Sequence, residues 1–464
     1  MLATSMLVGG GLAAAGTAAA DGAGTKAVLQ PGVRHSGGVE YTDAKGNHHQ
    51  LQGGILDLKT ADGKKLQTYC IDLLNPTKPN AEYTEAGWGS TSLANKPNEA
   101  GKILWILKNS FPQVGPKDLS KASGIEGLTE DDAAVATQAA IWRLSDGLNT
   151  TPMNNSRAVQ LTEYLSQKAV KLDEPKPTLS LSPSAVSGKV NDLLGPITVT
   201  SNGAVVDLSV DEAGAKAGMT VTDKDGKEIK TAKGGDQIYA KLAPGAKPGT
   251  AGIKASTAAS VSVGRAFLGN LDGVHSQTLI LAGSEPAKAT AEVAVTWAPT
   301  GPIPAASAAI DCVQGAVVVT IVNNGDQDFS YTLAGQTGSV PPGGSKTVPV
   351  KVAEDTAYDL TVKGSGGFEK KFTGVLNCKT DTAVTPSPKP SVSTSATPSP
   401  SATPSTSPSV TKPATPSATP TGPVLANTGG GGQTPLLAGI AGALVIAGGA
   451  AVYTLRRRGR HSRA

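Results

Sequence analysis

The stretch from Thr385 to Pro423 most restricts what this chain can fold into, because it consists almost entirely of Pro, Ser, Thr and Ala. A segment without large apolar side chains cannot bury a core. We therefore expect a disordered stalk over residues 380–424, with the folded part of the chain before it. Extended as polyproline II, a stalk of this length would reach on the order of 100 Å, which suits a folded head held away from its point of attachment.

The composition of the 464-residue chain favours several small β-modules over one large enzyme core. Aromatic residues make up only 4% and charged residues 17%, whereas there are 56 glycines and 32 prolines. The net charge of +4 is spread along the chain, and no Lys/Arg-rich block precedes residue 456, which argues against a nucleic-acid partner. His48-His49 has no Cys, Asp or further His at ligand spacing, so we expect a polar loop there and no metal site.

Proline-rich linkers and the spacing of turns predict a mainly β, multidomain fold. A first domain over residues 26–175 combines a β-sandwich with a helical part, which makes it α+β. A second β-sandwich is expected over residues 177–299, with His275 at its surface or in a turn. A small Ig-like β-domain over residues 303–379 completes the folded part.

The N-terminal 20 residues are typical of a signal peptide. Their apolar run ends in Ala18-Ala19-Ala20, a small-x-small cleavage site. The alternative, a buried N-terminal helix, is disfavoured by Gly9-Gly10-Gly11, which would weaken it. The mature chain is therefore expected to be secreted.

The C-terminal residues 425–464 have the features of an anchor. Leu425-Ala426-Asn427-Thr428-Gly429 precedes an apolar run of 20 residues that can cross a bilayer as a transmembrane helix, and Arg456-Arg457-Arg458 marks its cytoplasmic side. The arrangement resembles a sortase sorting signal of the actinobacterial Leu-Ala-x-Thr-Gly type. The resemblance implies membrane association before sorting, cleavage between Thr428 and Gly429, and attachment of Thr428 to peptidoglycan. An ordinary single-pass membrane anchor is the alternative.

A well-marked helix is predicted after Thr129, which is a good N-cap and is followed by three acidic residues in the first turn. Gly147 is a plausible end of this helix. Gln138 falls on its apolar face, together with Val135, Ile141 and Trp142. A core glutamine must have its amide satisfied, because unpaired polar groups are costly to bury. Backbone groups nearby could satisfy it, and so could a more specific partner.

Cys70 is the only cysteine before Cys312, and it lies in the apolar, strand-like run from Leu66 to Leu74. On its own it could be a buried structural thiol, because free cysteine is among the most buried residue types. The sequence around it is Tyr69-Cys70-Ile71-Asp72, and the helix carries Thr137-Gln138-Ala139-Ala140-Ile141-Trp142.

These two motifs, in this order, resemble the thioester domains of Gram-positive surface adhesins. The resemblance covers residues from about 28 to 175 and implies an internal thioester, formed with loss of ammonia, between the Cys70 sulfur and the Gln138 side-chain carbonyl. A thioester needs a dry pocket, and Tyr69 and Trp142, adjacent in sequence to the bond-forming residues, are candidates to exclude water. Thr137 and Ala140 complete the motif.

Cys312 and Cys378 bracket the last β-module, so a disulfide between them would tie its first strand to its last. A secreted chain permits disulfides. Closing a loop of this size would stabilise the module by about 4 kcal/mol in the chain-entropy model. The pairing leaves Cys70 as the odd cysteine, available for separate chemistry.

Three functions compete. The resemblance implies a wall-anchored adhesin, not an enzyme, that uses no cofactor and captures an amine once, with a lysine on a host or matrix protein as the expected nucleophile. A second hypothesis is a wall spacer whose thioester only crosslinks its own domain. A third is a transamidase or protease with Cys70 as nucleophile, which needs a nearby base such as His35, His48 or His49.

Overall fold

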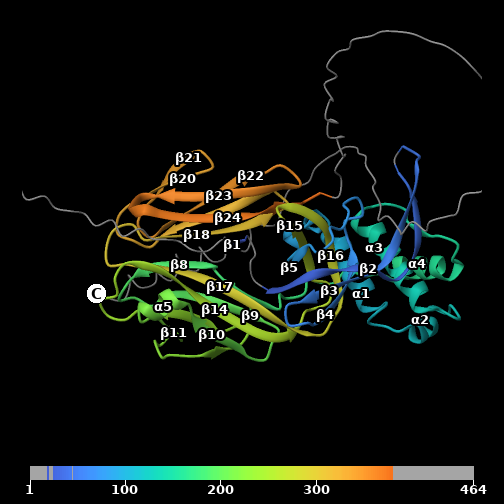
Figure 1. The fold of residues 1–464 in the computed structure, drawn as a ribbon, viewed down its shortest axis with the longest axis horizontal. Coiled ribbons are helices and arrows are strands. Elements are labelled where there is room, and N and C mark those ends of the chain that lie inside the picture. Colours follow the sequence, from blue (N-terminus) through green and yellow to red (C-terminus); the bar gives the residue numbers. More distant parts are fainter. Residues whose placement is uncertain (1–17, 20–23, 44, 380–464) are drawn as a thin grey trace, which may run out of the picture.

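The computed structural model describes residues 18–19, 24–43 and 45–379, and its folded part is mainly β, in agreement with the multidomain β class expected from the sequence. Figure 1 shows the helices between residues 97 and 168 gathered at one end and two β-modules side by side at the other. The predicted stalk and sorting signal lie outside the described residues, as does most of the signal peptide. Within the part of the chain that is described, no helix is long and apolar enough to cross a membrane.

Six strands pair in a closed antiparallel order, β2-β3-β4-β16-β15-β5 and back to β2. The sandwich expected in the first domain is therefore a barrel, closed where the start of β2 pairs with β5. The short strand β6 (Thr151–Pro152) is added to the outside of β2. The barrel strands are β2 (Gly24–Thr42), β3 (His48–Thr60), β4 (Lys65–Cys70), β5 (Glu82–Ala86), β15 (Ala266–Leu271) and β16 (Val274–Ser284).

The barrel takes β15 and β16 from a region that the sequence assigns to the second module. Ala266 pairs with Ala86 and Leu279 pairs with Cys70, so residues about 200 apart in the chain become neighbours. The expected boundary at residue 177 is thus not a boundary between sheets. Local alternation of apolar residues identifies a strand but does not identify a distant partner, which is why this pairing was missed.

The helical part packs on the barrel around α3 (Glu130–Ser145). Thr129 is its N-cap, as predicted: its hydroxyl accepts from the Asp132 N–H and the Asp132 carboxylate accepts from the Thr129 N–H, which forms a capping box. The helix is buried on nearly every side rather than along a single stripe. Its neighbours are α1 (Pro97–Lys108), α2 (Pro116–Ser123), α4 (Ser156–Lys168) and the 3-10 turns η1 (Trp88–Ser90) and η2 (Ser92–Asn95).

Glycines let α3 approach the barrel closely. A Cβ atom at Gly37 would lie 3.0 Å from Val135 Cγ2. At Gly53 it would lie 2.9 Å from Val39 Cγ2, 3.3 Å from Gln138 Cγ and 3.4 Å from Trp142 Cζ3. Glycine within a strand often marks such a close approach. Here it brings the Gln138 side of the helix onto β3.

A β-sandwich follows the helices, with the sheet β11-β13-β9-β7 packed on the sheet that contains β12, β10, β14, β17 and β8. Its elements are β7 (Leu179–Ser182), β8 (Ala185–Lys189), β9 (Leu194–Ser201), β10 (Val206–Val210), α5 (Glu212–Lys216), β11 (Thr220–Thr222), β12 (Thr231–Ala232), β13 (Gln237–Lys241), β14 (Gly249–Ser260) and β17 (Pro286–Ala298).

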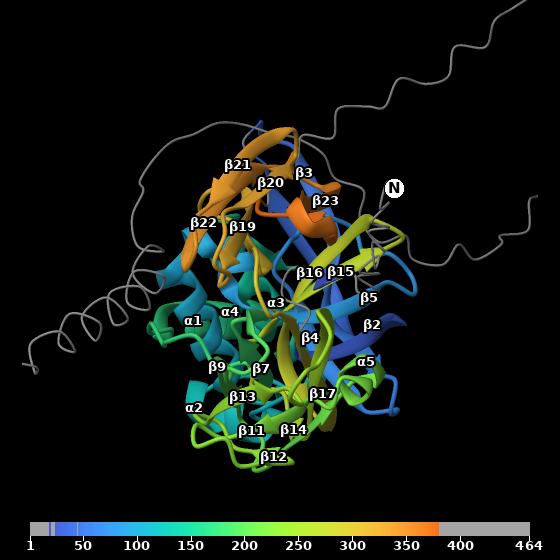
Figure 2. The same ribbon diagram turned by 90° about the vertical axis from the view of Figure 1, so that its left-hand side faces the viewer.

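The last module packs a three-stranded sheet against β23, β24 and their neighbours. It lies alongside the sandwich in Figure 1, and its strand β23 contacts the barrel strand β16, as Figure 2 shows from the side. Ala18–Ala19, as β1, run parallel to β24. The strands are β18 (Pro304–Asp311), β19 (Ala316–Asn323), β20 (Phe329–Leu333), β21 (Gln336–Val340), β22 (Gly344–Lys351), β23 (Thr356–Gly364) and β24 (Phe368–Leu376), with the turn η3 (Ser365–Gly367).

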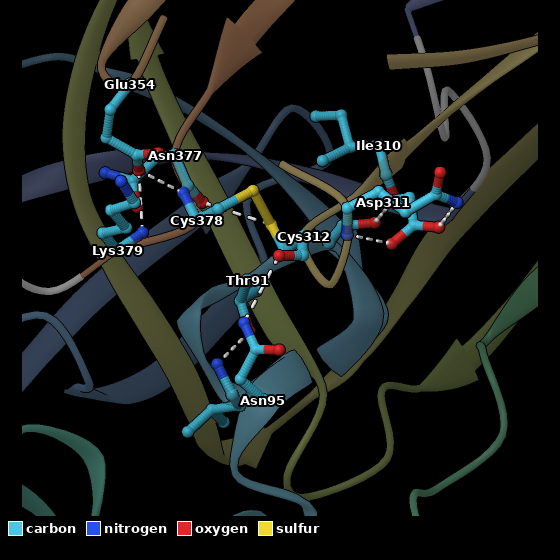
Figure 3. Close-up of a disulfide and its surroundings, with 12 residues drawn as sticks. Thr91, Asn95, Ile310, Asp311, Cys312, Glu354, Asn377, Cys378 and Lys379 are labelled. Carbon is cyan, nitrogen blue, oxygen red and sulfur yellow. Dashed lines mark hydrogen bonds between the residues drawn. A yellow bond between two sulfur atoms is a disulfide. The ribbon is translucent and has the colours of Figure 1, made fainter. Parts of the chain in front are cut away.

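The expected disulfide between Cys312 and Cys378 is present, with a Cα–Cα distance of 5.0 Å. Figure 3 shows it next to Thr91 and Asn95 of the first domain. Cys312 donates its N–H to the Gly89 carbonyl at 3.2 Å, and the Asn95 amide donates to the Cys312 carbonyl at 3.3 Å. The bridge therefore also lies at the contact between the last module and the 3-10 turns.

Gly53→Ala should loosen the contact between α3 and β3, because the added methyl group would crowd Val39 and Gln138. We expect the free energy of unfolding, measured by urea titration, to fall by about 1–3 kcal/mol. Gly89→Ala is the matched control, because a Cβ atom there meets nothing within 4 Å. Equal stability of the two variants would contradict this account of the packing.

Candidate functional site

Cys70 ends strand β4 at a place where one side of the strand has no ladder partner. On the β16 side Cys70 is opposite Leu279, and the next residue donates its N–H to the Thr278 carbonyl at 3.1 Å. On the β3 side the ladder stops two residues earlier, at Thr68 opposite Leu56. The backbone N–H and carbonyl of Cys70 are therefore left for another partner, and buried backbone groups need one.

The Gln138 side chain is that partner. The Cys70 N–H donates to Gln138 Oε1 at 2.9 Å, and Gln138 Nε2 donates to the Cys70 carbonyl at 2.8 Å. The amide thus takes the place of a β-strand peptide group, at a position where Gln138 is 1% exposed. The buried amide of Gln138 is therefore satisfied by the backbone of Cys70, the residue with which the sequence motifs pair it.

The Cys70 side chain is a buried free thiol whose sulfur accepts the Asp72 N–H at 3.2 Å. Burial raises the pKa of the thiol well above its usual range, and the negative charges of Asp146 and Asp72 act in the same direction. The Trp142 indole and the Asp72 N–H oppose this rise only in part. Cys70 is therefore a neutral thiol rather than an activated thiolate.

The other motif residues divide between two faces. Tyr69 points from β4 into the helical core, where its hydroxyl donates to the Phe111 carbonyl at 2.8 Å. Thr137 donates its hydroxyl to the Ala133 carbonyl at 2.7 Å, and Ala140 packs in the same helical core. Of these four residues, only Trp142 packs in the cluster that contains Cys70. Of the two residues expected to exclude water, Trp142 is therefore the one beside the sulfur.

A small cavity of about 30 Å³ reaches both Cys70 and Gln138. Its volume is enough for a water molecule or a slender substituent. None of the residues that line it is charged. They are Val33, Leu51, Gln52, Gly54, Leu56, Cys70, Leu73, Asn75, Pro76, Thr77, Gln138 and Gln277.

Asp72 organises the loop after Cys70, and the sequence did not identify this role. Its carboxylate accepts from the Asn75 amide at 2.9 Å and from the Thr278 N–H at 3.3 Å, and it pairs with His275 Nε2 at 3.0 Å. The prediction of a surface or turn position for His275 is wrong: it lies on β16 and is only 8% exposed. Because β16 closes the barrel, His275 and Gln277 reach the site from outside the expected domain.

Asp146 is the second site residue that sequence reasoning missed. Its carboxylate accepts from the Leu73 N–H at 3.0 Å and from the Ser145 hydroxyl at 2.6 Å. Burial raises its pKa from 3.8 to about 7, and the charge of Asp72 adds to the rise. The sequence contains a pattern that predicts this position for Asp146. Gln138, Trp142 and Asp146 follow one another at intervals of four and so share a helix face.

The histidines considered as catalytic bases bond elsewhere. His35 lies 3.3 Å from Glu130 and packs edge-on against Phe111. His48 and His49 begin β3 rather than lying in a loop, and His49 pairs with Asp43 at 3.0 Å. The hydrogen bond to the Cys70 sulfur comes instead from a backbone N–H. The base that a cysteine nucleophile requires is therefore not supplied by these residues.

Comparison with known families gives two matches. Residues 67–171 match the family model described as "Thioester domain", and this segment contains both Cys70 and Gln138. Residues 289–375 match the model described as "Bacterial phospholipase C, C-terminal domain", which covers most of β17 and nearly all of the last module. The first match supports the resemblance drawn from the two motifs. No curated protein matches the chain.

One similar solved structure is that of the Bacillus anthracis TIE protein, which is 14% identical to this chain. The match covers 76% of this chain and 81% of the TIE chain, with a TM-score of 0.26. The thioester domain of the Enterococcus faecium TIE86 protein is 19% identical over 60% of this chain and 97% of its own, with a TM-score of 0.27. The thioester domain of the Staphylococcus aureus TIE protein is 12% identical over 59% of this chain and 100% of its own, with a TM-score of 0.22.

Asp146→Asn should change how stability depends on pH. Between the ordinary carboxyl pKa of 3.8 and about 7, the unfolded chain releases the Asp146 proton while the folded protein keeps it, so the free energy of unfolding falls as the pH rises. The variant has no carboxyl group that can ionise at this position. We expect urea denaturation from pH 4 to 8 to show no such fall in its free energy of unfolding. Above pH 7 this free energy should exceed that of the parent by on the order of 3 kcal/mol.

Asp173→Asn is the control for this series, because Asp173 is exposed and lies outside the site. It should follow the parent protein at every pH. If the Asp146→Asn curve ran parallel to the parent curve throughout, the assignment of a raised pKa to Asp146 would be wrong.

Proposed function

We propose that Cys70 and Gln138 form an internal thioester and that the chain is a surface adhesin which uses this bond to capture an amine. The observation that carries the proposal is the reciprocal pair of hydrogen bonds between the Gln138 amide and the Cys70 backbone, beside a buried free thiol. The match of residues 67–171 to the thioester-domain family supports it independently.

The geometry suits formation of the bond. The Cys70 sulfur attacks Gln138 Cδ, the Cδ–Nε2 bond breaks, and the nitrogen leaves as ammonia with the thiol proton. During attack the negative charge develops on Gln138 Oε1, which already accepts the Cys70 N–H at 2.9 Å. A donor placed in advance at a developing oxyanion is a large source of rate enhancement. No cofactor is required.

The thioester is then used once. A target amine attacks Gln138 Cδ, the Cδ–Sγ bond breaks, the electron pair goes to the sulfur, and one proton moves from the nitrogen to the sulfur. The products are an amide between Gln138 and the target and a free Cys70 thiol. A lysine side chain is the expected nucleophile, since its terminal amine lies on a slender stem that a cavity of about 30 Å³ can admit. The reaction has no turnover, so the protein is not an enzyme.

The alternatives are less well supported. A cysteine-nucleophile enzyme must activate its thiol in every turnover, whereas the pKa of Cys70 is raised and its sulfur accepts a backbone N–H. The proposed thioester needs the attack of this sulfur only once. A thioester that only crosslinks its own domain needs no access, whereas the cavity reaches both bond-forming residues.

Secretion and attachment to peptidoglycan complete the proposal. Support comes from the sequence at both ends, where a signal-peptide pattern precedes the folded part and Leu425-Ala426-Asn427-Thr428-Gly429, an apolar run and arginines follow it. Sortase would cut after Thr428 and join the chain to the wall, so the Pro/Ser/Thr-rich stalk would span the wall and hold the barrel outside it.

Intact-mass spectrometry of the secreted ectodomain tests the thioester. We expect a mass lower than that of the disulfide-bonded sequence by one ammonia, and methylamine should add once, at Gln138, with release of the Cys70 thiol. Cys70→Ala and Gln138→Ala should each abolish both effects. Gln113→Ala is the control, because its amide also donates to a buried backbone carbonyl, that of Ala282, but lies outside the site. A full-mass protein that ignores methylamine would contradict the proposal.

Anchoring is tested separately in the native host. Thr428→Ala should abolish covalent attachment to peptidoglycan, because sortase would form its acyl intermediate at Thr428. The full-length variant should then appear in the membrane fraction and not in the peptidoglycan fraction released by muramidase. If the variant still appears in the muramidase-released fraction, the sorting signal lies elsewhere.

A further inference from the structure

One N–H group donates to the Cys70 sulfur, and a second lies in the same buried cluster. The first is the Asp72 backbone N–H, 3.2 Å from the sulfur. The second is the indole N–H of Trp142, whose presence lowers the pKa of the thiol. Trp142 Nε1 is buried and, among the described residues, has no hydrogen-bond acceptor at bonding geometry. Trp142 is 3% exposed, so water outside the protein does not satisfy this donor either.

An unpaired buried donor next to a reacting atom has a specific consequence. Leaving a buried N–H unpaired is unfavourable while the sulfur is neutral, as a thiol or a thioester. When the Cδ–Sγ bond breaks, the sulfur becomes an anion and a much stronger acceptor. An interaction that is stronger in the transition state than in the ground state accelerates the reaction.

The surroundings of the sulfur make such a donor necessary. Cys70 packs in an apolar cluster, and the carboxylates of Asp72 and Asp146 disfavour a negative charge on its sulfur. An unassisted Cys70 thiolate would therefore be a poor leaving group. That property protects the thioester from water, but it also slows capture of the target unless the thiolate is stabilised.

We infer that Trp142 Nε1–H, together with the Asp72 N–H, stabilises the departing Cys70 thiolate during amine capture, so that Trp142 accelerates the single-use reaction and is not only an apolar wall. The inference rests on the proposed function. The two donors act on the sulfur while the Cys70 N–H acts on the carbonyl oxygen, so each atom that gains charge has its own N–H. The amine nitrogen bonds to Cδ, the Cδ–Sγ electron pair goes to the sulfur, and the sulfur then takes one proton that the nitrogen releases.

Trp142→Phe tests the inference, because it removes the N–H and keeps an aromatic ring. We expect the thioester to form, as judged by the mass lower by one ammonia, and methylamine to add about 10- to 100-fold more slowly than in the parent. In the aminolysed product the pKa of the Cys70 thiol, followed by thiolate absorbance, should rise. Trp105→Phe is the control; Trp105 is a half-buried tryptophan on α1, and its replacement should change neither quantity.

The two possible roles of Trp142 predict opposite signs. If Trp142 only excluded water, its replacement would admit solvent, lower the pKa of the thiol and speed hydrolysis of the thioester. Loss of a donor raises the thiol pKa and slows aminolysis. A Trp142→Phe protein that reacts with methylamine at the parent rate, or whose thiol pKa falls, overturns the inference.

A second variant covers the case in which Trp142→Phe does not fold. Benzothienylalanine at position 142 keeps the two-ring shape and replaces only the N–H by sulfur, so slow aminolysis in that protein supports the inference and the parent rate overturns it. The mass of the parent protein tests the proposed function, whereas the kinetics of the two variants test the role of Trp142. If the parent has full sequence mass, the proposed function fails, whereas a parent thioester with unaltered kinetics in both variants refutes only the role of Trp142.

Discussion

The site depends on one interaction, the pairing of the Gln138 amide with the backbone of Cys70. This pairing is possible because the β3 ladder ends before Cys70 and leaves its N–H and carbonyl without a strand partner. Gly53 then allows α3 to approach closely enough for the amide to fill the gap. The same two hydrogen bonds satisfy a core glutamine and hold its side chain on the backbone of the residue that carries the thiol. The fold and the proposed chemistry depend on the same pairing.

The second constraint is closure of the barrel. Strands β15 and β16 follow all but one of the sandwich strands in the chain, and β16 carries His275 and Gln277 to the loop after Cys70. The carboxylate of Asp72 is held there by groups that lie about 200 residues away in sequence. The last module and its disulfide lie against the turns η1 and η2 of the same domain. The site is therefore supported from parts of the chain that lie outside the segment matched to the thioester-domain family.

The features that could be predicted from the sequence are those set by residues close together in the chain. The cap at Thr129, the position of Gln138 in a buried helix and the pairing of Cys312 with Cys378 depend on nearby residues or on a count of cysteines, and the structure has all three. The partners of β16, and with them the burial of His275, depend on strand pairing over a long separation, which local alternation does not specify. Asp146 could have been found from its spacing to Gln138, but its raised pKa could not, because burial is a property of the assembled fold.

The central claim is a covalent bond between Cys70 and Gln138, and peptide mapping tests it most directly. The ectodomain should be digested at acidic pH, where a thioester survives, and the fragments sequenced by tandem mass spectrometry. The account predicts one linked pair of peptides, joined at Cys70 and Gln138, with a mass equal to the sum of the two minus one ammonia. Two separate peptides, one with an unmodified thiol and the other with an intact Gln138 carboxamide, would contradict it.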